Sequence, residues 1–209
     1  MISYSQVIQR KTAIAARIPK RYLSGRTWDP VVGRKILSLG CGSVESDQFR
    51  ELQSCGVSVA GVDTDPASGA AYTRLSDVPA GQHNALVAEH VLEHMTHEQV
   101  LEAYQEIARI LPVNGIVMIT LPNVTNFGSW FNNFDHKNFS PPEDLAGMLE
   151  LYGFHVVDLF GWSKPGRFQR HSSMNDTERQ VCLFMDEQWG LTLPQYITFI
   201  GIRIEDVTT

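Results

Sequence analysis

Short apolar runs alternate with amphipathic stretches along most of the chain, and glycine, proline or asparagine separates many of them. Six runs have the composition and length of buried strands: 35–39, 57–63, 85–90, 116–122, 154–160 and 196–204. Three stretches repeat apolar residues at helical spacing: 45–54, 96–111 and 140–152. Strands separated by helices predict a doubly wound, Rossmann-like α/β fold whose mostly parallel sheet is covered on both faces.

Two helix starts carry the same signature. Thr96 is followed by Gln99, and Ser140 by Glu143, so each pair forms a capping box in which side chains and backbone donors satisfy one another. Proline follows Ser140, as is common at the first position of a helix. No clear helix lies between the last two strands to make them parallel, so we expect a terminal antiparallel pair.

Length and composition are typical of a single globular domain. It has 209 residues, of which 43% are hydrophobic and 19% charged. No apolar run reaches the roughly 20 residues of a membrane span, and no secretory signal is apparent. Three cysteines without a CxxC pair, Cys41, Cys55 and Cys182, indicate neither a disulfide framework nor a zinc ribbon. We therefore expect a cytoplasmic protein.

Charge is distributed unevenly. The net charge is −6, yet residues 1–28 contain six basic residues and no acid. We interpret this stretch as a basic helical segment that precedes a domain at 29–209. Its charge is typical of a solvated helix face, and a basic lid over an anionic substrate or a mitochondrial-type presequence are the alternatives.

A nucleoside site is indicated where the first strand ends. Gly40-Cys41-Gly42 lets the backbone approach a ligand closely, and Asp63, at the end of the second strand, can accept hydrogen bonds from both ribose hydroxyls. A tight turn and a helix cap are the plainer interpretations of these residues. Glu45 opposes a pyrophosphate at the helix start, and no Tyr-x3-Lys pair is apparent, so an NAD-dependent oxidoreductase is disfavoured.

Five blocks in the same order resemble the class I, seven-stranded S-adenosylmethionine-dependent methyltransferases that act on small molecules. They lie at 36–43, 59–66, 84–95, 111–123 and 135–154. The resemblance implies a seven-stranded sheet, S-adenosylmethionine as the cofactor and a set of cofactor-binding residues: Gly40, Cys41, Gly42, Asp63, Thr64, Ser76, Asp77, Glu89 and His90.

Within that set, the resemblance places the glycines against the methionine part, Asp63 on the ribose and Thr64 beside the adenine. Ser76 and Asp77 are implied to contact the adenine amino group, while Glu89 and His90 leave the fourth strand at the reaction centre. We expect Cys41 to be a packed small residue rather than a nucleophile.

Two positions depart from the family pattern. Ser38 replaces an acid that usually helps to hold the cofactor's ammonium, and Val44 replaces a frequent glycine. A catalytically inactive cofactor-binding or regulatory module is therefore kept as the alternative function.

Histidines offer proton-transfer chemistry near neutral pH. His90 and His136 are the candidates for a general base, with a structural role as the alternative for each. The run His90, His94 and His97 with Glu93 has a spacing that could gather metal ligands, but it crosses a strand end, a loop and a helix cap. We expect no metal.

The acceptor is expected to be a small molecule, such as a sugar-linked or anionic metabolite, methylated on oxygen rather than carbon. The segment 1–28 is expected to cover the acceptor side of the cofactor. Nucleic acid is disfavoured by the acidic body of the chain. Five aromatic residues follow the fifth and sixth strands and either line the acceptor pocket or belong to the core: Trp130, Phe131, Phe134, Phe139 and Trp162.

Overall fold

The computed structural model of the protein describes residues 2–19, 21–23, 26–124, 135–162 and 196–204. Its α-helices are α1 (Tyr4–Arg17), α2 (Asp47–Cys55), α3 (His97–Ile110) and α5 (Pro142–Glu150). Its strands are β1 (Arg21–Leu23), β2 (Lys35–Leu39), β3 (Ser58–Val62), β4 (Ala85–Glu89), β5 (Ile116–Pro122), β6 (Phe154–Trp162) and β7 (Tyr196–Arg203).

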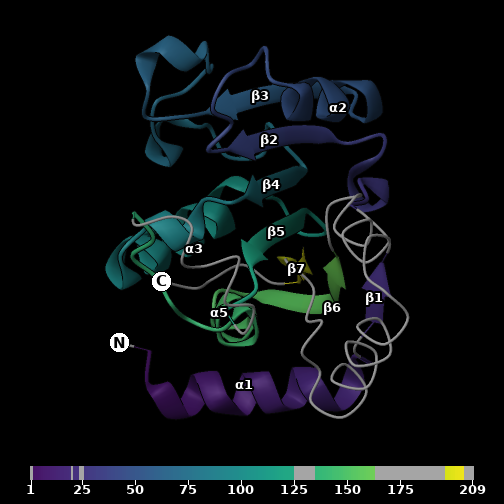
Figure 1. The fold of residues 1–209 in the computed structure, drawn as a ribbon, viewed down its shortest axis with the longest axis vertical. Coiled ribbons are helices and arrows are strands. Elements are labelled where there is room, and N and C mark those ends of the chain that lie inside the picture. The colour runs from purple at the N-terminus through teal and green to yellow at the C-terminus, as the bar shows by residue number, and fades with distance from the viewer. Residues whose placement is uncertain (1, 20, 24–25, 125–134, 163–195, 205–209) are drawn as a thin grey trace, which may run out of the picture.

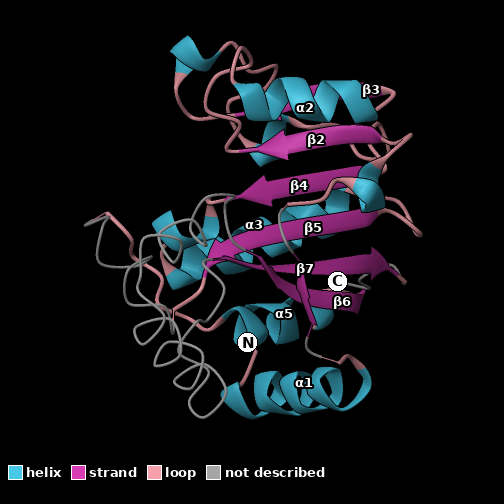
Figure 2. Ribbon diagram, turned by 45° about the vertical axis from the view of Figure 1, so that its right-hand side comes forward, coloured by secondary structure: helices cyan, strands magenta, loops and turns pink. Residues whose placement is uncertain are grey.

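All seven strands form one sheet in the order β1-β6-β7-β5-β4-β2-β3. β7 is antiparallel to both of its neighbours, β5 and β6, and the other pairs are parallel. Figure 2 shows β2, β4 and β5 pointing one way and β7 pointing the other. The predicted Rossmann-like α/β fold and its antiparallel pair are confirmed.

The seventh strand has an unexpected origin. Residues 29–209 supply six strands of the described sheet, because the stretch after β3 forms only a single bridge between Tyr72 and Val62. The remaining strand is β1, which comes from the N-terminal segment and pairs with β6 at the opposite edge. Our expectation of a helix throughout residues 1–28 is therefore wrong, since α1 ends at Arg17.

Helices cover the two faces unequally. α1, α3 and α5 contribute to the larger apolar core on one face, where Tyr104, Ile107 and Leu149 are fully buried. On the other face, Leu52 of α2 packs with Val31 and Ile36. Figure 1 shows α5 between α1 and the sheet, with α2 beside β2 and β3 at the far end.

Of the two predicted capping boxes, only the one at α3 forms. Thr96 and Gln99 exchange both hydrogen bonds. α5 instead begins at Pro142, with Pro141 before it and no side-chain cap, so the box at Ser140 is wrong. A residue that precedes proline is disfavoured in the helical region, which holds Pro141 extended at φ −55° and ψ 140°.

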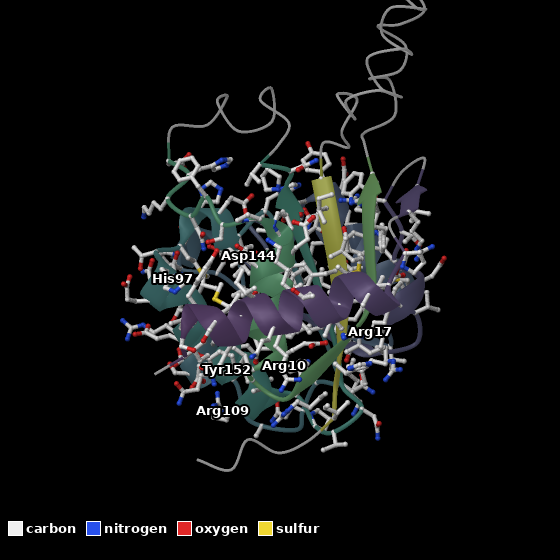
Figure 3. All side chains as sticks on the ribbon, turned by 90° about the horizontal axis from the view of Figure 1, so that it is seen from below. Arg10, Arg17, His97, Arg109, Asp144 and Tyr152 are labelled. Carbon is white, nitrogen blue, oxygen red and sulfur yellow. The ribbon has the colours of Figure 1, made fainter. Side chains whose placement is uncertain are left out.

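The basic charge of the N-terminal segment is matched inside the molecule. Lys11 pairs with Asp144 of α5 at 2.5 Å, and Arg17 pairs with Glu150. Arg21 pairs with Asp158 of β6. Figure 3 shows α1 crossing over the rest of the domain, with Asp144 beside it and Arg17 toward its C-terminal end. These ion pairs, rather than a solvated basic face, explain much of the uneven charge.

The Arg17–Glu150 pair is expected to stabilise the fold most among these pairs. The Glu150 side chain is only 3% exposed, and its Oε1 also accepts a hydrogen bond from the Val156 amide. Arg17→Met should therefore lower the free energy of unfolding by roughly 1–3 kcal/mol, because it leaves a buried carboxylate without its cation. Urea denaturation measures this change.

Arg21→Met is the matched control, since the Arg21 side chain is 48% exposed. An exposed ion pair contributes at most about 1 kcal/mol, so this variant should unfold close to the parent. An equal loss of unfolding free energy in the two variants would contradict the larger contribution expected of the pair with the buried Glu150.

His83 makes stability dependent on pH. It is buried before β4, and neither ring nitrogen has a hydrogen-bond partner among the described residues. Burial, together with the charge of Lys35, lowers its pKa below the ordinary 6.5. Well above pH 6.5, His83 is neutral in both the folded and the unfolded chain. As the pH falls below 6.5, His83 takes up a proton in the unfolded chain before it does so in the folded one, and the stability of the fold declines.

His83→Leu should therefore reduce the loss of melting temperature between pH 7 and pH 5, which thermal unfolding at both pH values would measure. His97→Gln is the control, because His97 is exposed at the start of α3. A slope that is the same in parent and His83→Leu would rule out this titration as a cause.

Candidate functional site

A cavity of about 740 Å³ lies at the carboxyl ends of β2 and β3, against one side of α3. This volume is within the range of small-molecule sites, and the carboxyl edge is where open α/β sheets bind ligands. Its walls come from the strand ends, the segment after β3, α3 and the 135–138 loop; they include Gly40, Asp63, Thr64, Ser76, Val91, His94, Gln99, Glu102, Glu106 and Lys137.

The loop after β2 has a backbone that requires glycine. Gly40 has φ 63°, and a Cβ atom on it would lie 2.5 Å from Cγ2 of Val91. Gly42 has φ 62° with open space beside it. A side chain at position 40 would therefore collide with the cavity wall, whereas glycine leaves the backbone bare for a ligand.

Asp63 is fixed by the same loop. Its Oδ2 accepts a hydrogen bond from the Gly42 amide at 2.7 Å, and its Oδ1 accepts one from the Asp65 amide at 2.9 Å. The carboxylate is half-buried and lines the cavity. Each oxygen retains a free lone pair, so the pair can also accept the two hydroxyls of a ribose.

Cys41 turns its side chain away from this cavity. A Cβ on Gly61 of β3 would lie 2.6 Å from the Cys41 Sγ, so the thiol packs against the sheet. Burial, with a further contribution from Asp63, raises its pKa above the ordinary value. A buried thiol of this kind is a poor nucleophile, which agrees with the packing role expected of it.

Of the three residues implied to contact adenine, only two line the cavity. Thr64 and Ser76 line it. Asp77 does not, and its carboxylate accepts hydrogen bonds from Thr73 and Ser76 instead. Three cavity-lining residues, Gln99, Glu102 and Glu106, were not predicted from the sequence. Their spacing along α3 marks a polar stripe next to the buried apolar one.

Beyond the cavity walls, Glu89 ends β4 with its side chain buried. Its Oε2 accepts a hydrogen bond from Nη1 of Arg26 at 2.8 Å. Arg26 also pairs with Glu51 of α2. The N-terminal segment therefore reaches the strand ends through an arginine, whereas α1 packs on α5 and lines no part of the cavity.

His90, the next residue, is held rigidly. It has a left-handed backbone with φ 59°, and its amide donates to the Thr120 carbonyl. Its ring lies 4.6 Å from the Tyr196 ring, and its Nδ1 lies 3.3 Å from Oε1 of Glu93. These contacts indicate a positioning role more than a mobile base.

His136 is brought beside His94 by the backbone. The amides of Lys137 and Asn138 both donate to the Glu93 carbonyl, which fixes this loop against the turn that follows β4, and the two imidazole rings are 4.9 Å apart. Burial lowers the pKa of His136 below its ordinary value; the nearby Glu93 opposes this shift and His94 adds to it. A lowered pKa favours the neutral ring, which is the form that can take a proton.

The structure gathers part of the predicted histidine run with a residue from another loop, in a group whose ligand atoms could hold a metal ion. Among the described residues, the group whose ligand atoms come within 4.8 Å of one another is Glu93, His94 and His136, without His90 or His97. The grouping depends on the 135–138 loop folding back onto Glu93, a contact between residues far apart in the sequence.

The aromatic residues fall into three groups. Trp162 belongs to the core, where its indole donates to the Thr198 hydroxyl at 3.0 Å. Phe139 is exposed. Trp130, Phe131 and Phe134 lie outside the described residues, as does Cys182. In the described parts of the chain, no helix has the length and apolar character needed to cross a membrane.

Comparison with known proteins places this site in a family. A family model described as a methyltransferase domain matches residues 8–159. No curated protein matches the chain. A solved S-adenosylmethionine-dependent methyltransferase from Archaeoglobus fulgidus is similar with 18% identity and a TM-score of 0.66, covering 94% of each chain.

Two further structures share the fold. An S-adenosylmethionine-dependent methyltransferase from Mesorhizobium loti is 14% identical, with a TM-score of 0.57 over 92% of this chain and 96% of that one. Phosphoethanolamine N-methyltransferase 2 from Haemonchus contortus, solved with S-adenosylmethionine, is 11% identical, with a TM-score of 0.57 over 97% and 58%. The glycine loop, Asp63 and the cavity fit the same cofactor, and the chain belongs to the class I S-adenosylmethionine-dependent methyltransferases.

Proposed function

We propose that the protein methylates a hydroxyl oxygen of a small molecule, with His136 as the general base and His90 as a positioning residue. The observation that carries this proposal is the position of the His136 imidazole, 4.9 Å from that of His94, a residue of the cavity wall; burial also lowers the pKa of His136. A hydroxyl must lose its proton when it is methylated, and a histidine with a lowered pKa is suited to accept it.

The residues act mainly by binding and placement. Asp63 and the Gly40 loop hold the nucleoside, so that the cofactor presents an electrophilic methyl group at the strand ends. The bound cofactor would supply the methyl group, which would pass from its sulfur to the acceptor oxygen and leave a neutral thioether. His136 would take the hydroxyl proton on a ring nitrogen.

The acceptor is proposed to be a sugar-linked or other anionic metabolite. Lys137 is exposed and lines the cavity beside His94, where it offers a cation to an anionic group. The acidic body of the chain disfavours nucleic acid, and a cytoplasmic location remains a prediction.

Methyl transfer is tested with S-adenosylmethionine that carries ¹³C in its methyl group, offered with a panel of hydroxyl, amine and activated-carbon acceptors. The ¹³C chemical shift of the product identifies the methylated atom. A methyl on oxygen supports the proposal, and one on nitrogen or carbon contradicts it. Tight cofactor binding without S-adenosylhomocysteine formation from any acceptor favours the alternative of a regulatory module.

A further inference from the structure

Glu93 carries a buried carboxylate with one oxygen left unbonded. It lies in the short helical turn Leu92–His94 after β4, and its side chain is 1% exposed. Its Oε1 lies 3.3 Å from Nδ1 of His90, while Oε2 is buried and has no hydrogen-bond partner among the described residues. Leaving an ionised oxygen buried without a donor is costly, so this carboxylate is suited to a cation that forms beside it.

The fold brings His136 to this carboxylate. One ring nitrogen of His136, one of His94 and one carboxylate oxygen of Glu93 lie within 4.8 Å of one another. The Glu93 carbonyl also accepts hydrogen bonds from the amides of Lys137 and Asn138, at 2.7 and 3.0 Å. Glu93 therefore holds the loop of His136 through its backbone and places its side chain beside the imidazole.

Among the charges around His136, that of Glu93 acts most strongly. Burial has the largest effect on the pKa of His136 and lowers it, and Glu93 has the next largest effect and raises it. His94 and His90 lower this pKa, and Asp135 raises it. The Asp135 side chain is 57% exposed, so water and salt screen its charge far more than that of the buried Glu93. Glu93 is therefore the stronger counter-charge for a protonated His136.

A histidine that acts as a general base becomes a cation when it takes a proton. On His136 this positive charge would form within 4.8 Å of an oxygen of Glu93, so the two groups would make a neutral pair. A carboxylate next to a catalytic histidine orients the ring and stabilises the imidazolium, and the proton stays on the histidine. Because the ion pair would form only as the acceptor reacts, it would stabilise the transition state rather than the bound acceptor.

We propose that Glu93 is the positioning residue for His136: its buried carboxylate orients the imidazole and stabilises the imidazolium that forms when the acceptor hydroxyl gives up its proton. The inference rests on the proposed function, and it extends the general base from one residue to a carboxylate–histidine pair. Glu93 acts through His136 and has no contact with the acceptor in this assignment.

The pairing is tested without an acceptor, by NMR titration of ¹⁵N-labelled histidine in the parent and in Glu93→Gln. The signal of His136 is identified by its loss in His136→Ala. Glutamine keeps the size of the side chain and removes its charge, so the pKa of His136 should fall in Glu93→Gln. Asp135→Asn is the matched control and should lower this pKa less, because Asp135 is exposed. No fall in Glu93→Gln, or an equal fall in the two variants, would overturn the assignment.

Turnover on an oxygen acceptor tests the consequence for catalysis. Glu93→Gln should lower kcat by roughly 10- to 150-fold, the range for a hydrogen bond to a charged group, with little change in KM or in the affinity for S-adenosylhomocysteine. The rising limb of its pH profile should move to lower pH, because His136 without this counter-charge stays neutral to a lower pH. Glu93→Asp returns the charge on a shorter side chain and should recover part of the lost kcat.

Three further outcomes would overturn the assignment. A loss of cofactor affinity equal to the loss of kcat in Glu93→Gln would mean that Glu93 only supports the shape of the site. Turnover that EDTA abolishes and Zn²⁺ or Co²⁺ restores would make Glu93 a metal ligand instead. If Glu93→Gln fails to fold, the titration of Glu93→Asp decides, and an unchanged pKa of His136 there would reject the pairing. Methylation of nitrogen or carbon by the parent would overturn the proposed function, whereas the titration decides the pairing by itself.

Discussion

Asp63→Ala is expected to weaken S-adenosylhomocysteine binding by about 1.5–3 kcal/mol, or roughly 10- to 150-fold. The substitution removes a charged acceptor from the ribose hydroxyls. It also releases the amides of Gly42 and Asp65, both of which donate to this carboxylate. Calorimetric titration of the variant and the parent measures the loss.

Two variants separate these effects. Asp63→Asn keeps one acceptor oxygen for the loop but loses the charge, so its affinity should fall between those of Asp63→Ala and the parent. Asp65→Ala is the control, because Asp65 is exposed and its side chain accepts only the nearby Ala67 amide in the described structure. Unchanged affinity in Asp63→Ala would reject the ribose assignment.

The fold was predictable where each element carries its own signal. The strand over Ile116–Pro122 has the bounds expected from the sequence, because the apolar run and the turn at Asn114-Gly115 are both local. The same holds for α3 and its capping box. β1 has no such signal: its three residues become a strand only because the edge of β6 is available to them.

The same distinction between local signals and distant contacts applies to the residues of the site. The glycine loop and Asp63 have a recognisable spacing, so their meeting at the edge of two adjacent parallel strands follows from the fold. Contacts across long separations had no signal in the sequence. Arg26 meets Glu89 at a separation of 63 residues, and Arg17 meets Glu150 at 133, so neither partner could be named beforehand. His136 was predicted as a candidate base, but its contact with His94 could not be predicted from the sequence.

His136→Ala should lower turnover by about a hundredfold or more while leaving cofactor affinity nearly unchanged. Removing a general base typically costs 10²- to 10⁴-fold in rate, and His136 does not line the cofactor cavity. Turnover on an oxygen acceptor and calorimetric binding of S-adenosylhomocysteine give the two quantities. His97→Ala is the matched control, because His97 is exposed and lies outside the group formed by His94 and His136.

The pH profile tests the role of His136 more directly. A general base must be neutral, so turnover should rise with pH and level off above the pKa of His136. Burial lowers that pKa, so the rising limb should lie below pH 6.5, where an ordinary histidine would titrate. The limb should vanish in His136→Ala. His90→Gly should retain the limb, because glycine accepts the φ of 59° at that position while the base stays in place. If the limb survives in His136→Ala and disappears in His90→Gly, the base is His90 and the assignment made here is reversed.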